Sequence, residues 1–267
     1  MAEVVKQARR AEQIGFDTVY LPDHLGYLAP LPTAVAVAAA TESVVVGPWV
    51  LNTGFYRPAL LARDLAGVDA ATGGRLEIGL GTGFMANEFA AAGLPFPSPG
   101  ERIRTLGEHI TAIRAALSDP DYHPAPIQQP PPITVAGSGD RLLAMAAQHA
   151  DIVSIGALGT EADIAERIGY VKAKAGPRIA DIELSFGFFQ VAIDKPDYLP
   201  VLDILAPKAG DAERRQMATL LVGPVSAAAE RIDRLRELGI SYFSIGFNDG
   251  LTTSWETMEK LVGAVKG

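Results

Sequence analysis

The stretch VVVGPWVLNTGFYRPALLARDLAGVDAATGGRLEIGLGTG, residues Val44 to Gly83, carries the pattern that decides the fold. It begins with the apolar run Val44–Leu51, passes through a segment of helical period at Ala59–Ala71 and ends in a second apolar run at Leu76–Gly81. A strand, a helix and a strand in this order are typical of a parallel βαβ unit, whose strands are covered on both faces. The pair Gly73-Gly74, which lies between the helical segment and the second apolar run, favours the end of the helix there, because glycine adopts a positive φ at little cost. The stretch therefore predicts an α/β protein with a parallel sheet.

The same alternation runs along the rest of the chain. We predict the strands Thr18–Pro22, Val44–Leu51, Leu76–Gly81, Ile133–Ala136, Ile152–Ile155, Glu183–Ile193 and Tyr242–Phe247. We predict the helices Ala2–Ile14, Thr33–Glu42, Ala59–Ala71, Glu101–Ser118, Arg141–His149, Glu161–Lys174, Ser226–Leu238 and Trp255–Val265. This pattern predicts a TIM (β/α)8-type barrel, a fold of about 250 residues in which a strand precedes the first helix. That first strand is missing from this sequence, so we expect either a start upstream of Met1 or another element in its place.

A single barrel domain over residues 1–267 is the simplest expectation, because no linker and no repeat interrupts the alternation. The segment Asp194–Gly223, rich in Pro, Lys and Asp, is expected to be an insertion. Insertions after barrel strands commonly shape the mouth of a site.

Composition excludes several kinds of protein. The 267 residues contain no cysteine, which rules out disulfide scaffolds, thiolate metal sites and cysteine nucleophiles, and we expect no metal. The net charge is −8 and no basic run is longer than Arg9-Arg10 or Arg214-Arg215, so nucleic acid is not an expected partner. The charged N-terminus does not resemble a signal peptide, and neither Ala34–Ala40 nor Val44–Leu51 reaches the ~20 residues that cross a bilayer. We therefore expect a cytoplasmic protein with no membrane partner.

Polar residues at the carboxyl ends of the predicted strands are the candidate site residues, because the active sites of α/β barrels form there. Asp23 and His24 follow the first strand, and a carboxylate beside an imidazole suits ligand binding or proton transfer. The alternative is a helix-capping aspartate beside a solvent-facing histidine. Asn52-Thr53-Gly54 follows the next strand and indicates either a bulge that approaches a ligand or an ordinary loop. The other histidines, expected to be structural or exposed, are His109, His123 and His149.

Glycine-rich segments follow three further strands. Gly79–Glu88 has neither the lysine of a P-loop nor the spacing of a dinucleotide fingerprint, but its glycines favour a phosphate or flat ring close to main-chain N–H groups. Ala136–Gly139 lies between a strand and a helix, where free N–H groups and the helix terminus favour a phosphate. Gly246–Gly250 ends the last strand, and its Asp249 is expected either to face the substrate or to make a turn.

Three segments taken together resemble a known family. They are GFDTVYLPDH (Gly15–His24), VVVGPWVLNTGFYRPALLARDLAGVDAATGGRLEIGLGTGFMANEF (Val44–Phe89) and PPPITVAGSGDRLLAMAAQHADIVSIG (Pro130–Gly156). Their order and spacing resemble the bacterial luciferase-like flavin and deazaflavin oxidoreductases, and most closely the branch that uses coenzyme F420. The resemblance covers roughly residues 5–157 and fades through the insertion.

The resemblance implies a role for each matching position. His24, with Asp23 beside it, would be the proton donor or acceptor near the coenzyme ring. A non-proline cis peptide would support the back of the ring at Trp49–Val50, with Val50–Leu51 as the alternative. The other residues that the resemblance places on the coenzyme are Asn52, Thr82, Gly83 and Asn87 at the ring and ribityl side, and Ala136, Gly137, Ser138 and Gly139 at the phosphate. Some relatives carry a catalytic glutamate at the position of Phe84, so this chain departs from their sugar-phosphate dehydrogenase mechanism.

The implied function is that of an oxidoreductase that transfers a hydride between coenzyme F420 and a small organic substrate. The resemblance also implies a homodimer. Two alternatives follow from the same residues: an FMN-dependent luciferase-like monooxygenase, and a degenerate barrel that dimerises without catalysis.

Overall fold

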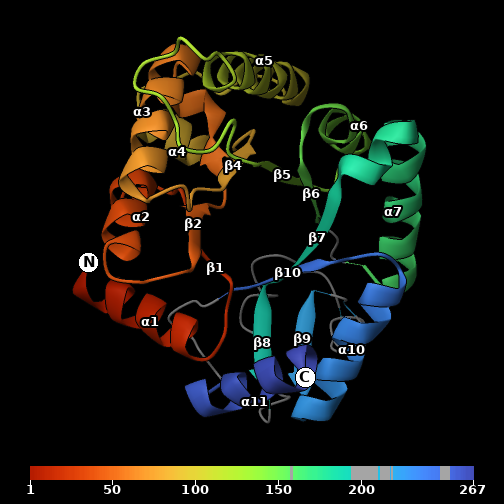
Figure 1. Cartoon of the computed structure of the whole chain (residues 1–267). Helices are drawn as coiled ribbons and strands as arrows, with labels where there is room; N and C mark the ends of the chain where they lie inside the picture. Colours follow the sequence, from red (N-terminus) through yellow and green to blue (C-terminus); the bar gives the residue numbers. More distant parts are fainter. Residues whose placement is uncertain (157–158, 194–209, 211–216, 218, 247–252) are drawn as a thin grey trace. The chain divides into compact units, whose positions relative to one another are not determined.

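The structure, a computed structural model, describes residues 1–156, 159–193, 210, 217, 219–246 and 253–267 (Figure 1). The chain divides into two compact units. Unit 1 comprises Met1–Ala136 and Gln148–Ile152, and unit 2 comprises Gly137–Ala147 and Val153–Gly267. No helix of the described residues is long and apolar enough to cross a membrane.

Unit 1 contains a parallel sheet. Its strands are β1 (Thr18–Leu21), β2 (Val45–Pro48), β3 (Leu51–Asn52), β4 (Ile78–Gly81) and β5 (Ile133–Gly137, with Gly137 in unit 2). β1 pairs with β2, β3 with β4 and β4 with β5, each in parallel, and an isolated parallel bridge joins Val46 of β2 to Leu76, two residues before β4. Both bridge residues are buried, as is Leu80 in β4. The parallel βαβ unit predicted over residues 44–81 is therefore confirmed.

The helices of unit 1 cover this sheet. They are α1 (Ala2–Gln13), α2 (Pro30–Ala38), the 3-10 turn η1 (Thr53–Phe55), α3 (Pro58–Ala71), α4 (Ala86–Ala91) and α5 (Pro99–Leu117). α3 packs on both α2 and α5, and α2 packs on β2 (Figure 1). Proline begins α2, α3 and α5, where its fixed φ suits the first helical turn. The short helix α4 was not predicted.

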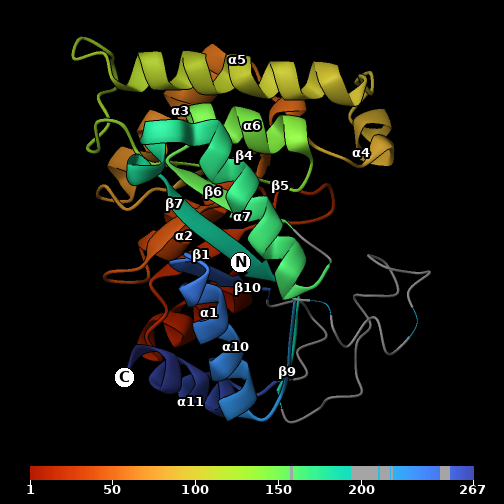
Figure 2. The same ribbon diagram turned by 90° about the vertical axis from the view of Figure 1, so that its right-hand side faces the viewer.

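Unit 2 is also built from parallel strands and helices. Its strands are β6 (Ile152–Ile155, with Ile152 in unit 1), β7 (Glu183–Phe188), β8 (Gln190–Ile193), β9 (Leu220–Gly223) and β10 (Tyr242–Ile245). Its helical segments are α6 (Asp140–His149, ending in unit 1), α7 (Glu161–Ala175), η2 (Gly176–Asp181), α10 (Val225–Glu237) and α11 (Trp255–Lys266). β7 lies beside β6 and pairs in parallel with β10, and β8 pairs in parallel with β9. α10 packs against α11 and β9 (Figure 2).

Three predicted segments need correction. The strand predicted over Val44–Leu51 is interrupted after Pro48, where the backbone forms a bulge before β3. The strand predicted over Glu183–Ile193 is divided into β7 and β8. The segment Asp194–Gly223, expected to be an insertion, ends in the strand β9, which was not predicted, and most of its remaining residues lie outside the described residues.

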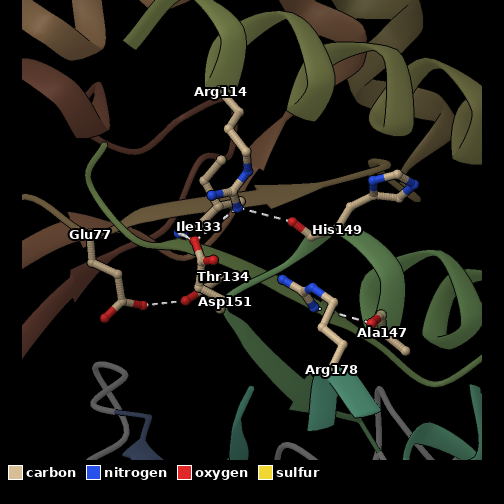
Figure 3. Close-up of polar contacts among 8 residues, drawn as sticks. All are labelled: Glu77, Arg114, Ile133, Thr134, Ala147, His149, Asp151 and Arg178. Atoms are coloured by element: carbon tan, nitrogen blue, oxygen red, sulfur yellow. Dashed lines mark hydrogen bonds and ion pairs between the residues drawn. The ribbon is translucent and has the colours of Figure 1, made fainter. Parts of the chain in front are cut away.

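Two carboxylates, the half-buried Asp151 and the buried Asp69, bind the amino ends of strands in unit 1. Asp151, just before β6, accepts hydrogen bonds from Arg114 Nη2 and from the backbone N–H of Ile133, both at 2.9 Å (Figure 3). Arg114 Nη2 also donates to the carbonyl of His149 at 3.0 Å. Asp69, near the end of α3, accepts from the backbone N–H groups of residues 127 and 128 at 2.6 and 2.9 Å. These networks fasten loops to strand starts, the end of an α/β fold that serves stability.

Candidate active site

Asp23 lies just beyond the carboxyl end of β1, and its side chain binds the end of β3. Its Oδ2 accepts hydrogen bonds from the backbone N–H of Asn52 at 3.0 Å and from the hydroxyl of Tyr56 at 3.2 Å. The helix-capping alternative is wrong, because α2 begins at Pro30 with Ala29 as its N-cap. Burial raises the pKa of Asp23, although both hydrogen bonds oppose the shift. Burial and the nearby Asp23 carboxylate also raise the pKa of Tyr56, so its hydroxyl stays protonated as a donor.

His24 is held by the carboxylate of Glu88, the last residue of the candidate segment Gly79–Glu88 and one for which the sequence predicted no role. Its Nδ1 lies 2.9 Å from Oε1 of Glu88, and the same oxygen accepts a hydrogen bond from the backbone N–H of Leu25 at 3.3 Å. The side chain of Glu88 is 10% exposed, whereas that of His24 is 35% exposed. The rings of Tyr27 and Phe84 each lie 6.1 Å from the imidazole, centroid to centroid. His24 is therefore fixed on one side by an acid and flanked by two aromatic rings.

The bulge between β2 and β3 contains a cis peptide bond at Trp49–Val50, as predicted for that position. The backbone N–H of Trp49 donates to the carbonyl of Leu21 at 2.8 Å. A Cβ on Gly79 would collide with the Pro48 carbonyl, and a Cβ on Gly81 would collide with the side chain of Val50. These two glycines therefore admit the bulged strand itself. That they also bring main-chain N–H groups close to a phosphate or a ring stays a prediction.

Asn52 and Gly83, predicted separately, lie together in unit 1. The buried carboxamide of Asn52 accepts from the backbone N–H of Gly54 at 3.1 Å. Gly83 has φ +64°, and a Cβ there would collide with that carboxamide. Thr82 is half-buried and Asn87 is exposed. The structure thus brings Asp23, Asn52 and Gly83 to the same strand ends as His24 and Glu88.

The predicted phosphate segment begins with Ala136, half-buried in unit 1, and continues as residues 137–139 of unit 2. The carbonyl of Gly137 accepts from the backbone N–H of Gly156 at 2.8 Å, and a Cβ on Gly137 would collide with Leu142. By contrast, no atom of the described residues lies within 4 Å of a Cβ built on Gly139, and Ser138 beside it is exposed. This turn is open at Gly139, directly before α6. The other predicted candidate, Gly246–Gly250, lies outside the described residues except for its first glycine.

Comparison with known proteins identifies the chain's relatives. A family model described as luciferase-like monooxygenase matches residues 1–198. An F420-dependent glucose-6-phosphate dehydrogenase of Intrasporangium calvum is 34% identical over 174 residues, which cover 56% of this chain and 52% of that enzyme. This chain spans about half the length of the first such relatives that it matches.

Solved structures show the same fold. An F420-dependent secondary alcohol dehydrogenase, in complex with an F420-acetone adduct, aligns with a TM-score of 0.81 at 20% identity over 99% of this chain and 94% of its own. A long-chain alkane monooxygenase aligns with a TM-score of 0.78 at 16% identity over 98% of this chain and 83% of its own. At these identities the similarity establishes the α/β fold alone. The family match covers more than half of the residues, and the chain therefore belongs to the luciferase-like monooxygenase family.

Proposed function

We propose that this protein is an oxidoreductase that transfers a hydride between coenzyme F420 and a small organic substrate. The observation that carries the proposal is the His24 imidazole, one third exposed and hydrogen-bonded to Glu88 at the carboxyl ends of the unit 1 strands. The site residues that the resemblance assigns, from residue 23 to residue 139, fall within the family match at 1–198. Matched relatives named as F420-dependent dehydrogenases favour F420 over FMN.

The residues present are compatible with this coenzyme in each unit taken separately. F420, when bound, supplies a ring carbon that accepts or donates a hydride. In unit 1, we propose that the Trp49–Val50 bulge lies against the ring, with Asn52, Thr82, Gly83 and Asn87 on the ring and ribityl side. In unit 2, the open turn at Gly139 and the exposed Ser138 hydroxyl precede a helix N-terminus, an arrangement that suits a phosphate. We propose that Ala136 and Gly137 complete this segment.

His24 is the proposed proton donor or acceptor. A hydride transfer to or from an alcohol or carbonyl group must be balanced by a proton, and an imidazole exchanges protons near neutral pH. The carboxylate of Asp23, bound by Asn52 and Tyr56, holds the backbone next to His24 in place.

The substrate of the matched glucose-6-phosphate dehydrogenases does not carry over to this chain. Phe84 stands where some of the family carry an acid, its side chain cannot donate a proton, and it is 74% exposed. Phe84 lies edge-on to His24, so an apolar ring borders the proposed reaction site. We therefore propose a small organic substrate other than a sugar phosphate.

The proposal extends to the whole protein. The parallel strands and the structural neighbours favour a closed TIM-type barrel that forms one domain over residues 1–267. A cytoplasmic homodimer, expected from the sequence, is part of the same proposal.

Coenzyme titration tests the proposal directly. The full chain is titrated with F420, with FMN in both redox states, and with neither, and binding is followed by fluorescence quenching and by the melting temperature. A ligand at 100 times its dissociation constant should stabilise the protein by about 2.7 kcal/mol. We expect F420 alone to give this shift.

The same titration separates the alternatives. Stabilisation by reduced FMN, together with oxygen consumption, would replace the proposal by a monooxygenase. No response to either coenzyme would favour the degenerate barrel.

A further inference from the structure

We infer that Glu88 is a positioning residue, which holds His24 with a proton on Nδ1 and leaves Nε2 to exchange a proton with the substrate. This inference rests on the proposed function for the identity of the reaction. The placement of the proton itself is a property of the protein without any coenzyme.

The chemistry of the two side chains determines where the proton lies. An ionised carboxylate accepts hydrogen bonds and cannot donate them. Glu88 Oε1 already accepts from the backbone N–H of Leu25, so this oxygen acts as an acceptor, and Nδ1 of His24 at 2.9 Å must then be the donor. In a neutral imidazole one nitrogen carries the proton and the other does not, so a hydrogen bond donated by Nδ1 fixes the state of Nε2 as well. Nε2 is consequently the nitrogen that has a lone pair in the neutral ring.

The fold fixes Glu88 where it can perform this role. Glu88 belongs to α4, and its neighbour Phe89 is almost completely buried. The ring of Phe89 packs against Phe55 at 5.3 Å and against Phe96 at 5.1 Å, centroid to centroid. A Cβ on Gly54 would collide with the same ring. Anchored at Phe89, a helix of only six residues presents the adjacent carboxylate to His24.

The charge of the pair suits proton transfer. When Nε2 takes a proton, the imidazole becomes a cation, and a carboxylate 2.9 Å from Nδ1 stabilises that cation. Glu88 thus acts through His24 and makes no contact with the reacting atoms in this scheme. Oriented histidines in metal sites and catalytic triads depend on carboxylate partners in the same way.

The first measurement is the nitrogen-15 NMR spectrum of the histidine side chains in the coenzyme-free protein. The chain has four histidines, and the signal lost in His24→Ala assigns His24. In the wild type with a neutral His24 ring, we expect the proton on Nδ1. Glu88→Gln retains an oxygen that accepts from Nδ1 and should retain this tautomer, whereas Glu88→Leu should lose it.

The second measurement is steady-state kinetics with F420. We expect Glu88→Gln to lower kcat by about 10- to 100-fold with KM changed less than about threefold, as for other residues that orient a catalytic group. Since Glu88 acts through His24, adding Glu88→Leu to His24→Ala should cause no further loss. The matched control is Glu108→Gln on α5, where the side chain is 66% exposed, and it should leave the spectrum and kcat unchanged.

The outcomes separate this inference from the proposed function. A wild-type His24 with its proton on Nε2, or an unchanged tautomer in a folded Glu88→Leu protein, would overturn the role of Glu88. If the losses of kcat from His24→Ala and Glu88→Leu multiply in the double variant, the role of Glu88 is also overturned, because Glu88 would then act independently of His24. If the tautomer depends on Glu88 but F420 neither binds nor reacts, the positioning role is supported and the proposed function fails.

Discussion

The two ends of the strands in unit 1 use buried carboxylates in opposite ways. At the amino ends, Asp69 is fully buried and accepts hydrogen bonds from two backbone N–H groups and from the side-chain amide of Gln128. At the carboxyl ends, Glu88 Oε1 lies 2.9 Å from Nδ1 of the His24 imidazole, whose side chain is one third exposed. The donors to Asp69 are amide groups, which take no part in proton transfer, whereas an imidazole is the side chain used most often as a general acid or base. The comparison indicates that one end holds the fold together and the other end holds a reactive group in position.

The largest effect should come from removing the reactive group. His24→Ala should lower kcat by about 10²- to 10⁴-fold, the range that general acid–base catalysis supplies, with coenzyme affinity largely intact. The measurement is turnover with F420, together with the dissociation constant from fluorescence. The matched control is His149→Ala, because His149 is exposed at the end of α6. Unchanged turnover in His24→Ala would remove this residue from its proposed role.

The amino end should respond in the opposite way. Asp69→Ala leaves the backbone N–H groups of residues 127 and 128 without their acceptor, and should lower the free energy of unfolding by about 3 kcal/mol. Denaturant unfolding measures this loss, and the folded fraction should still bind coenzyme. Asp64→Ala, on the exposed face of the same helix, should change stability by less than about 0.5 kcal/mol. Equal stability of the two variants would contradict the division between the ends.

Gly83 tests whether close packing at the carboxyl end matters for the site. In Gly83→Ala, the new Cβ must displace the carboxamide of Asn52, so we expect a loss of about 2 to 3 kcal/mol and weaker coenzyme binding. Gly93→Ala is the matched control, since Gly93 has φ +69° and no atom of the described residues lies within 4 Å of its Cβ position. The control should lose only about 1 to 2 kcal/mol from backbone strain. Coenzyme affinity that falls equally in both variants would argue against a special role for the contact with Asn52.

Sequence patterns predicted those strands and helices that a short stretch of residues is enough to identify. β1 and β6 were placed to within a residue because each is a short apolar run bounded by turn residues. The apolar run of residues 44–51 conceals a break, since the side-chain pattern continues through the bulge where the backbone pairing does not. β9 was missed because it lies at the end of Asp194–Gly223, whose Pro, Lys and Asp content predicted an insertion without a strand. Periodicity reports burial, and it does not report which strands pair.

The sequence also predicted only part of the candidate site, namely the residues that directly follow strands. The residues at strand ends, Asp23, His24 and Asn52, were found because strand ends are where such folds carry polar groups. Glu88 was missed because it lies 64 residues from His24, on a helix of six residues that is too short for a periodic signal. The available signal was its position in the glycine-rich stretch, one residue after Asn87.

The smallest expected effect concerns the stability cost of Asp23. Because burial raises the pKa of Asp23, the folded protein retains the carboxyl proton at pH values where the unfolded chain has lost it. The wild type therefore loses stability as the pH rises from about 4, the ordinary value for aspartate, through the raised pKa. Asp23→Asn cannot ionise and keeps an oxygen that accepts from Asn52 and Tyr56, so it should gain stability relative to the wild type over that rise. Urea unfolding of both proteins between about pH 4 and pH 7 measures the difference. If the free energy of unfolding of Asp23→Asn instead falls relative to that of the wild type as the pH rises, the fold favours the ionised carboxylate. Asp23 would then belong with Asp69 as a residue that holds the fold together.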